Sequence, residues 1–135
     1  MADAEVPVEL ARIVINEQSP EQVIVLREIG GKRQFPIVIG IFEAWAIDRK
    51  VKDIDVPRPM THDLLANVIA ELSGELREVR INDIEGGTFY ARLMIRQGEK
   101  ELSVDCRPSD AVALAVRAAV PIFVESVVFE KLASG

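Results

Sequence analysis

The chain has few of the residues on which the common catalytic and structural devices depend. Among its 135 residues are one histidine, one cysteine and one tryptophan, and aromatic side chains make up only 5%. A single cysteine excludes an intramolecular disulfide and a zinc site built from several cysteines, and it fits a reducing compartment. The sequence also lacks a P-loop, a dinucleotide-binding glycine motif, a zinc-protease motif and a serine nucleophile motif.

Positive charge and long hydrophobic runs are also scarce. The formal net charge is -6, which argues against a broad basic surface for binding phosphate backbones. A nuclease is still allowed, because metal-dependent phosphodiester cleavage uses carboxylates and needs only local Arg or Lys. No apolar run approaches the roughly 20 residues of a membrane span, and the N-terminus lacks the pattern of a secretory signal. We therefore expect a cytoplasmic protein with no membrane partner.

The hydrophobic residues, 49% of the chain, alternate or recur at helical spacing in well-separated segments. The pattern predicts strands at 8–16, 22–29, 35–40, 76–82, 89–96, 102–106 and 121–124, and helices at 41–52, 61–73 and 109–119. Residues 125–132 are expected to form either a terminal helix or a tail. This mixed order predicts an α+β fold, with a mixed or antiparallel sheet and three to four helices. The length fits one domain over residues 1–135, with its core at about 8–130.

Some of these segments carry more specific predictions. The helix at 109–119 is apolar almost all round, which is typical of a helix enclosed in a core or an interface. Phe42 and Trp45 are assigned to a core or an interface, and alternation predicts that Leu102, Val104 and Cys106 face inward. The helix after residue 60 is predicted to have Thr61 as its N-cap and Gly74 just past its end.

The sole histidine lies in the segment Pro57–Ala66, beside an acidic residue and a helix start. His62 is either an exposed side chain or a general acid/base or metal ligand at a helix N-terminus, where the dipole favours the neutral ring. Asp63 either complements the helix start or orients His62.

Arg-Pro pairs precede two predicted helices, at Arg58 and Arg107. Each arginine could hold a phosphate beside free helix N–H groups, or form an intramolecular salt bridge to Asp63 or Asp110. Ser109 and Asp110 either serve only to stabilise the start of the second helix or form part of a functional site at that helix N-terminus. Carboxylates that could share Mg²⁺ or Mn²⁺ are found at Glu43, Asp63, Asp105 and Asp110.

Seven blocks along the chain resemble, in order, the bifunctional nuclease family. They are Arg33–Gly40, Phe42–Ala44, Pro57–Leu65, Thr88–Leu93, Val104–Asp105, Arg107–Ala111 and Pro121–Phe123. The resemblance implies an α+β domain that degrades RNA and DNA and is commonly oligomeric. The positions that match the family's motifs are Glu43, Arg58, His62, Asp63, Asp105, Arg107 and Asp110.

The leading hypothesis is a nuclease that cleaves phosphodiesters without sequence specificity. His62, Asp63, Glu43 and Asp105 are its candidate catalytic residues. Arg58 and Arg107 are the candidate phosphate ligands, and Glu43, Asp105 and Asp110 are the candidate ligands for Mg²⁺ or Mn²⁺. The alternative is a non-catalytic homo-oligomeric module that binds a protein or a small anion, supported by the apolar helix and the acidic charge.

Overall fold

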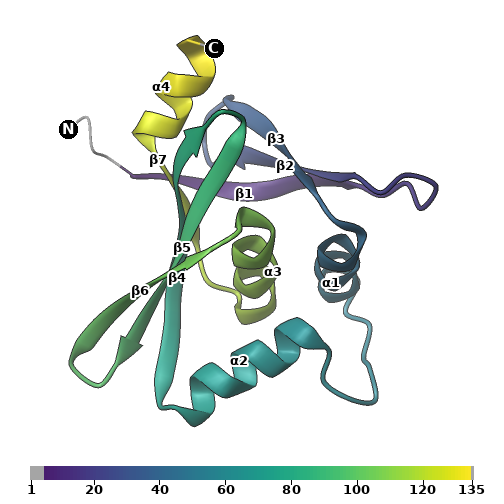
Figure 1. Ribbon diagram of the computed structural model, residues 1–135, viewed down its shortest axis with the longest axis vertical. Helices are drawn as coiled ribbons and strands as arrows, with labels where there is room; N and C mark the ends of the chain where they lie inside the picture. Colours follow the sequence, from purple (N-terminus) through teal and green to yellow (C-terminus); the bar gives the residue numbers. More distant parts are fainter. Residues whose placement is uncertain (1–4, 135) are drawn as a thin grey trace.

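One seven-stranded sheet organises the computed structural model, which describes residues 5–134 (Figure 1). The strand order is β3-β2-β1-β7-β4-β5-β6, and neighbouring strands are antiparallel except for the parallel pair β4–β7. The elements are β1 (Glu5–Val14), β2 (Gln22–Glu28), β3 (Gln34–Ile39), α1 (Ile41–Val51), α2 (Thr61–Glu71), β4 (Gly74–Glu85), β5 (Thr88–Gln97), β6 (Lys100–Cys106), α3 (Pro108–Ala118), β7 (Ile122–Glu125) and α4 (Ser126–Ser134). This mixed sheet with four helices confirms the predicted α+β class. Residues 1–4 and 135 of the predicted domain lie outside the described residues.

The first hairpin and the third strand form as predicted. β1 pairs with β2, and β3 lies at one edge of the sheet. The edge position suits Pro36, which has no N–H to donate to a further strand. The strand pattern of this half of the sheet is therefore set by local sequence.

The predicted apolar helix, α3, occupies the centre of the core. Ala111, Val112, Ala113, Leu114 and Ala115 are each at most 3% exposed. Figure 1 shows α3 against the sheet with α1 beside it, and both α1 and α2 contact it. The prediction that this helix is enclosed is confirmed. Its cover comes from the same chain, so it no longer requires a partner subunit.

The middle hairpin is longer than predicted. β4 continues through Ile84 and Glu85, which pair with Phe89 and Thr88 of β5. The turn is therefore reduced to Gly86 and Gly87, both with positive φ (57° and 83°). Tight two-residue hairpin turns favour glycine at such positions.

The prediction that Leu102, Val104 and Cys106 face inward is only half right. Leu102 and Val104 lie opposite Ile95 and Leu93, so the face is correct. However, Leu102 is 37% exposed and Val104 is 43% exposed. The physical reason is that β6 is the last strand of the sheet and extends away from the helices (Figure 1).

Phe42 and Trp45 do not belong to the core of this chain. Phe42 is 73% exposed and Trp45 is 45% exposed, although both lie on α1. The buried face of α1 consists of Ala44 and Ile47 instead. Helical spacing alone did not reveal which face of the helix would be covered.

Both ends of α2 differ by one residue from the prediction. Met60, not Thr61, is the N-cap, and Asp63 caps the helix by accepting a hydrogen bond from the Met60 N–H at 2.9 Å. At the other end Ser73, not Gly74, has the left-handed conformation, with φ of 63°. Gly74 instead begins β4, where an added Cβ would lie 3.1 Å from both the backbone oxygen and the Cγ2 of Ile69.

This arrangement predicts opposite effects for two neighbouring substitutions. Ser73→Gly should raise the free energy of unfolding by about 0.5–1 kcal/mol, because glycine adopts positive φ without steric cost. Gly74→Ala should lower it by about 1–3 kcal/mol, because the methyl group overpacks against Ile69 and Ile95. Urea unfolding of the two variants and the parent measures both values. A destabilising Ser73→Gly would contradict the assignment of the left-handed position to Ser73.

No helix within residues 5–134 is both long enough and apolar enough to cross a lipid bilayer.

Candidate functional site

The N-terminal turns of three helices contribute polar side chains to one region. Glu43 lies in the first turn of α1, His62 and Asp63 in that of α2, and Asp110 in that of α3. Arg107 is the N-cap residue of α3. The sequence separates these residues by up to 67 positions, so their meeting depends on the packing of α1 and α2 against α3.

Four of these side chains form a continuous hydrogen-bonded chain. His62 Nε2 lies 2.9 Å from Asp110 Oδ1. Arg107 Nε donates to Asp110 Oδ2 at 2.9 Å, and Arg107 Nη2 lies 3.3 Å from Glu43 Oε2. Glu43 Oε1 in turn accepts a hydrogen bond from the Gly40 N–H at 3.1 Å, which caps α1. We call His62, Asp110, Arg107 and Glu43 the histidine cluster.

The histidine is the most enclosed member of this cluster. His62 is only 8% exposed, which contradicts the reading of an exposed side chain. Asp110 has a side-chain exposure of 25%, whereas that of Arg107 is 67%. The cluster therefore runs from a buried imidazole to a guanidinium open to solvent.

The charges in the cluster stabilise one another. The hydrogen bond from His62, together with that from Arg107, lowers the pKa of Asp110, although partial burial opposes the shift. The pKa of Arg107 is raised, chiefly by its hydrogen bond to Asp110. Asp110 is therefore an ionised hydrogen-bond acceptor at neutral pH.

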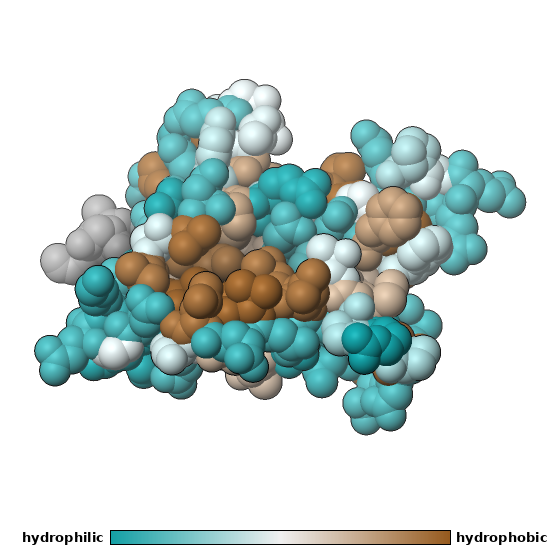
Figure 2. All heavy atoms as spheres, turned by 60° about the horizontal axis from the view of Figure 1, so that its bottom comes forward, coloured by the Kyte–Doolittle hydropathy of each residue, from teal (hydrophilic) through white to brown (hydrophobic). Residues whose placement is uncertain are grey.

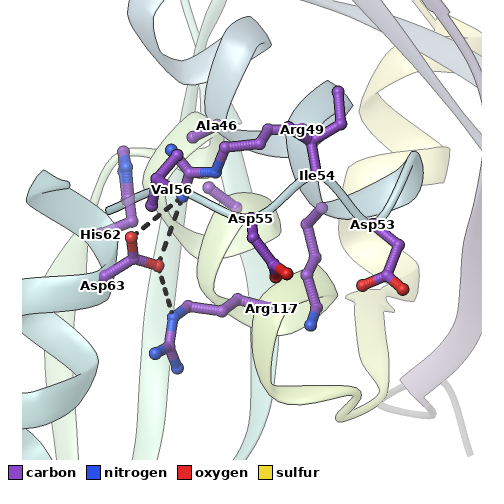
Figure 3. Close-up of a pocket in the computed structure, with 11 residues that line it drawn as sticks. Ala46, Arg49, Asp53, Ile54, Asp55, Val56, His62, Asp63 and Arg117 are labelled. Atoms are coloured by element: carbon purple, nitrogen blue, oxygen red, sulfur yellow. Dashed lines mark hydrogen bonds and ion pairs between the residues drawn. The ribbon is translucent and has the colours of Figure 1, made fainter. Parts of the chain in front are cut away.

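A second cluster lies next to the first and is centred on Asp63 (Figure 3). Arg117 Nε donates to Asp63 Oδ1 at 2.8 Å, and Arg49 Nη2 donates to Asp63 Oδ2 at 3.1 Å. The carboxylate thus joins α1, α2 and α3 through Arg49, its own backbone and Arg117. Burial works to raise the pKa of Asp63, but the Met60 N–H and the two arginines lower it overall. We call Arg49, Asp63 and Arg117 the arginine cluster.

Two cavities open on either side of His62. One, of about 320 Å³, is lined by His62, Asp110, Arg107 and Glu43 and by the apolar side chains of Phe42, Trp45 and Met60. The other, of about 290 Å³, is lined by the arginine cluster, His62 and the loop from Asp53 to Val56. His62 and Arg49 are among the residues that line both cavities.

Two predicted site residues lie outside both clusters. Asp105 is on β6, its side chain is 74% exposed, and its carboxylate lies 3.7 Å from Arg92 Nη1. Arg58 lies on the exposed loop before α2, and within residues 5–134 the structure gives it no ion pair. Their roles as catalytic and phosphate-binding residues stay predictions.

The predicted carboxylates are not arranged as a metal site. Glu43 and Asp110 approach each other, but Arg107 lies between them, and their oxygens already accept hydrogen bonds from N–H donors. Asp105 does not join them, and the part of the chain that the structure describes has no group of three His, Cys, Asp or Glu suited to a metal ion. This donor set does not fit Mg²⁺ or Mn²⁺ as it stands. A metal requirement stays a prediction.

Two residues of the site, Arg49 and Arg117, were not predicted from the sequence. No local signal marks either of them, because each meets Asp63 only through tertiary packing. Burial, with the nearby Asp110 and Asp105 carboxylates, raises the pKa of the Cys106 thiol to about 12. Cys106 is thus a protonated thiol and not a nucleophile at neutral pH.

Fold and site together define a small α+β domain whose helix N-termini hold a histidine–carboxylate–arginine cluster. The chain belongs to the family of the bifunctional nuclease domain, whose model matches residues 24–134. An uncharacterised protein of Mycobacterium tuberculosis is 44% identical over 121 residues, which cover 90% of this chain and 72% of that protein.

Two plant relatives have the name bifunctional nuclease. Bifunctional nuclease 2 of Oryza sativa subsp. japonica is 31% identical and bifunctional nuclease 1 of Oryza sativa subsp. indica is 28% identical, each over 112 residues. These matches cover 80% of this chain but only 34% of each rice protein. The predicted family is confirmed, and the match to the named nucleases is confined to a third of their length.

Proposed function

We propose that this chain hydrolyses phosphodiester bonds in RNA and DNA without sequence specificity, with His62 as the group that moves the proton. The observation that carries this proposal is the 2.9 Å contact of His62 Nε2 with Asp110 Oδ1, beside an exposed arginine in one cavity. A positioned base and a phosphate-binding cation are the minimum equipment for such a reaction. Family membership supports the same reaction class.

Asp110 determines which nitrogen of His62 can act as the base. Because the pKa of Asp110 is lowered, its carboxylate is ionised and can only accept a hydrogen bond at neutral pH. A neutral His62 must then have its proton on Nε2, which leaves the lone pair on Nδ1. Asp110 also stabilises the imidazolium that forms when Nδ1 takes up a proton.

Arg107 is placed to hold the phosphate. Its Nε and Nη2 are bonded to Asp110 and Glu43, whereas Nη1 has no hydrogen bond to another residue within 5–134. In the proposed reaction His62 Nδ1 removes a proton from the attacking water, whose oxygen forms a bond to phosphorus. The P–O bond to the leaving oxygen breaks, that oxygen takes up a proton from bulk water, and the His62 imidazolium returns its proton to solvent. Arg107 offsets the negative charge that develops on the phosphate oxygens.

Chelation separates this arrangement from a metal-dependent one. Because no step above uses a metal, we expect hydrolysis of a single-stranded substrate to continue in EDTA. The measurement compares initial rates in EDTA, Mg²⁺ and Mn²⁺. Loss of activity in EDTA, with recovery in Mg²⁺, would contradict this metal-free scheme and show that the reaction requires a divalent cation.

We also propose that the chain forms a homo-oligomer, because α2 has an apolar face that stays exposed in the described part of the chain, residues 5–134. Leu64, Val68 and Leu72 are 56%, 44% and 64% exposed, and Leu65 is 38% exposed. Figure 2 shows a continuous hydrophobic band on the face that includes the bottom of Figure 1, where α2 lies. Contiguous apolar surface with a polar rim is typical of an interface.

Introducing a charged residue into the exposed apolar face of α2 tests the oligomer proposal. Val68→Glu should shift the sedimentation coefficient toward that of the monomer and leave the fold intact, because Val68 is exposed within the chain. Glu71→Gln, on the same helix, provides a control that adds no buried charge. An unchanged sedimentation coefficient for Val68→Glu would contradict the proposal.

A further inference from the structure

An exposed aromatic pair lies at the rim of the cavity that contains the histidine cluster. Phe42 and Trp45 are one turn apart on α1, and their rings meet edge to face with centroids 5.8 Å apart and an interplanar angle of 81°. Both rings line the same 320 Å³ cavity as His62 and Arg107. Aromatic side chains are few in this chain, so an exposed pair at this position requires an explanation.

We propose that Phe42 and Trp45 stack against a base of a single-stranded nucleic acid and thereby place the adjacent phosphate at Arg107. This inference rests on the proposed function, because it names the substrate class of the same site. The cavity combines apolar rings with two guanidinium groups, Arg49 and Arg107, which matches a base next to its phosphate.

The acidic composition makes such a contact necessary. A net charge of -6 leaves little long-range attraction for a polyanion, so binding energy must come from local contacts. Stacking on an aromatic ring is tolerant of sequence because every base has a π-face. This agrees with hydrolysis that does not depend on sequence.

The same geometry predicts selectivity for single strands. In a duplex the faces of the bases are already covered by their neighbours, whereas unpaired bases are free to stack on protein side chains. Phe42 and Trp45 are exposed, but they can stack only on a base whose own face is not already covered by a neighbouring base. We therefore expect the site to prefer single-stranded over duplex substrates.

The only tryptophan of the chain allows binding to be measured directly at this site. The intact protein is titrated with a short phosphorothioate DNA strand, with an abasic strand of equal length and charge, and with the corresponding duplex. We expect the base-containing strand to quench Trp45 fluorescence and to bind about 5- to 150-fold tighter than the abasic strand, the range given by stacking of a single base. The duplex should bind like the abasic strand.

Phe42→Ala should remove most of the difference between the base-containing and abasic strands. Because Phe42 is 73% exposed, this variant should fold. Ile29→Ala, at a position 53% exposed and outside the cavity, is the control and should bind like the parent. Anisotropy of labelled strands gives a second readout that does not depend on Trp45.

Equal affinity for the base-containing and abasic strands would overturn the inference, as would an unchanged ratio in Phe42→Ala. A change of sedimentation coefficient in Phe42→Ala, with unchanged strand binding, would assign the rings to contact between copies and would also overturn it. These measurements do not depend on cleavage. The stacking proposal can therefore fail while the hydrolysis proposal stands, and the reverse also holds.

Discussion

Replacement of His62 by alanine is expected to lower the rate of phosphodiester hydrolysis by about 100- to 10,000-fold, the usual contribution of a general acid or base. Asp110→Asn should lower it by about 10- to 1,000-fold, because asparagine neither holds the Nε2 tautomer as firmly nor stabilises the imidazolium. In both variants the fold should persist. Circular dichroism and thermal unfolding of the purified proteins check that it does.

The control for these variants is Glu101→Gln on β6, where a side chain that is 64% exposed pairs with Arg96 at 3.7 Å. Its hydrolysis rate should match that of the parent. Contaminating nucleases are a particular hazard for a small protein of this class. Activity that is identical in the parent, His62→Ala and Asp110→Asn would identify a contaminant and contradict the proposed function.

Asp105→Asn tests a predicted catalytic residue that lines a cavity with Arg107 and Asp110 but pairs with Arg92 instead of joining the histidine cluster. Asp105 lies on the exposed edge strand and faces Arg92. We expect a smaller loss of activity than in His62→Ala. A loss as large as that of His62→Ala would show that Asp105 takes part in catalysis, as the family motif implied.

Replacement of Asp63 by asparagine is expected to lower the free energy of unfolding by about 2–3 kcal/mol, because it removes the charge shared by two arginines and weakens the cap of α2. The side chains of Asp63 and Arg49 are 16% and 18% exposed, so solvent screens their pairing less than that of a surface salt bridge. Urea unfolding at neutral pH measures the difference. Asp48→Asn, which removes an exposed i,i+4 pair with Lys52, is the control and should cost below about 0.5 kcal/mol.

Acid should remove this difference between the parent and Asp63→Asn. The folded-state pKa of Asp63 is lowered, so its carboxylate contributes stability above the pKa of an unfolded Asp, about 3.9, and loses it as pH falls through the folded value. The unfolding free energies of parent and variant should therefore begin to converge as the pH falls below about 4. A difference that stays constant down to pH 2 would show that Asp63 acts through shape and not through charge.

Local sequence was sufficient for most of the fold. Alternating apolar residues gave the strands, and the run from Ala111 to Ala115 predicted a buried helix, because these patterns follow directly from the periodicity of strands and helices. The same reasoning failed at the rims of the molecule. Whether Phe42 on α1 or Val104 on β6 is covered depends on which element packs over it, and no local pattern records that.

The site could be predicted in part. The sequence identified three helix-start residues that could take part in binding or catalysis: Arg107, which precedes a proline, Asp110 and His62. The structure joins them in the histidine cluster. The salt-bridge reading of Arg107 is confirmed, and the cap reading of Asp63 is confirmed. Arg49 and Arg117 could not be found, because their only signal is proximity to Asp63 in space.

The sequence alone determined the order of strands and helices along the chain, the class of fold and the set of residues able to take part in binding or catalysis. This was possible because backbone preference and hydrophobic periodicity act over a few neighbouring positions. Tertiary structure decided which of those residues meet. The packing of α1 and α2 against α3 buries His62 beside Asp110, turns Arg107 between Asp110 and Glu43, and leaves Arg58 and Asp105 outside. Contacts between residues tens of positions apart depend on how whole helices pack together, and that packing cannot be deduced from any single segment of the sequence.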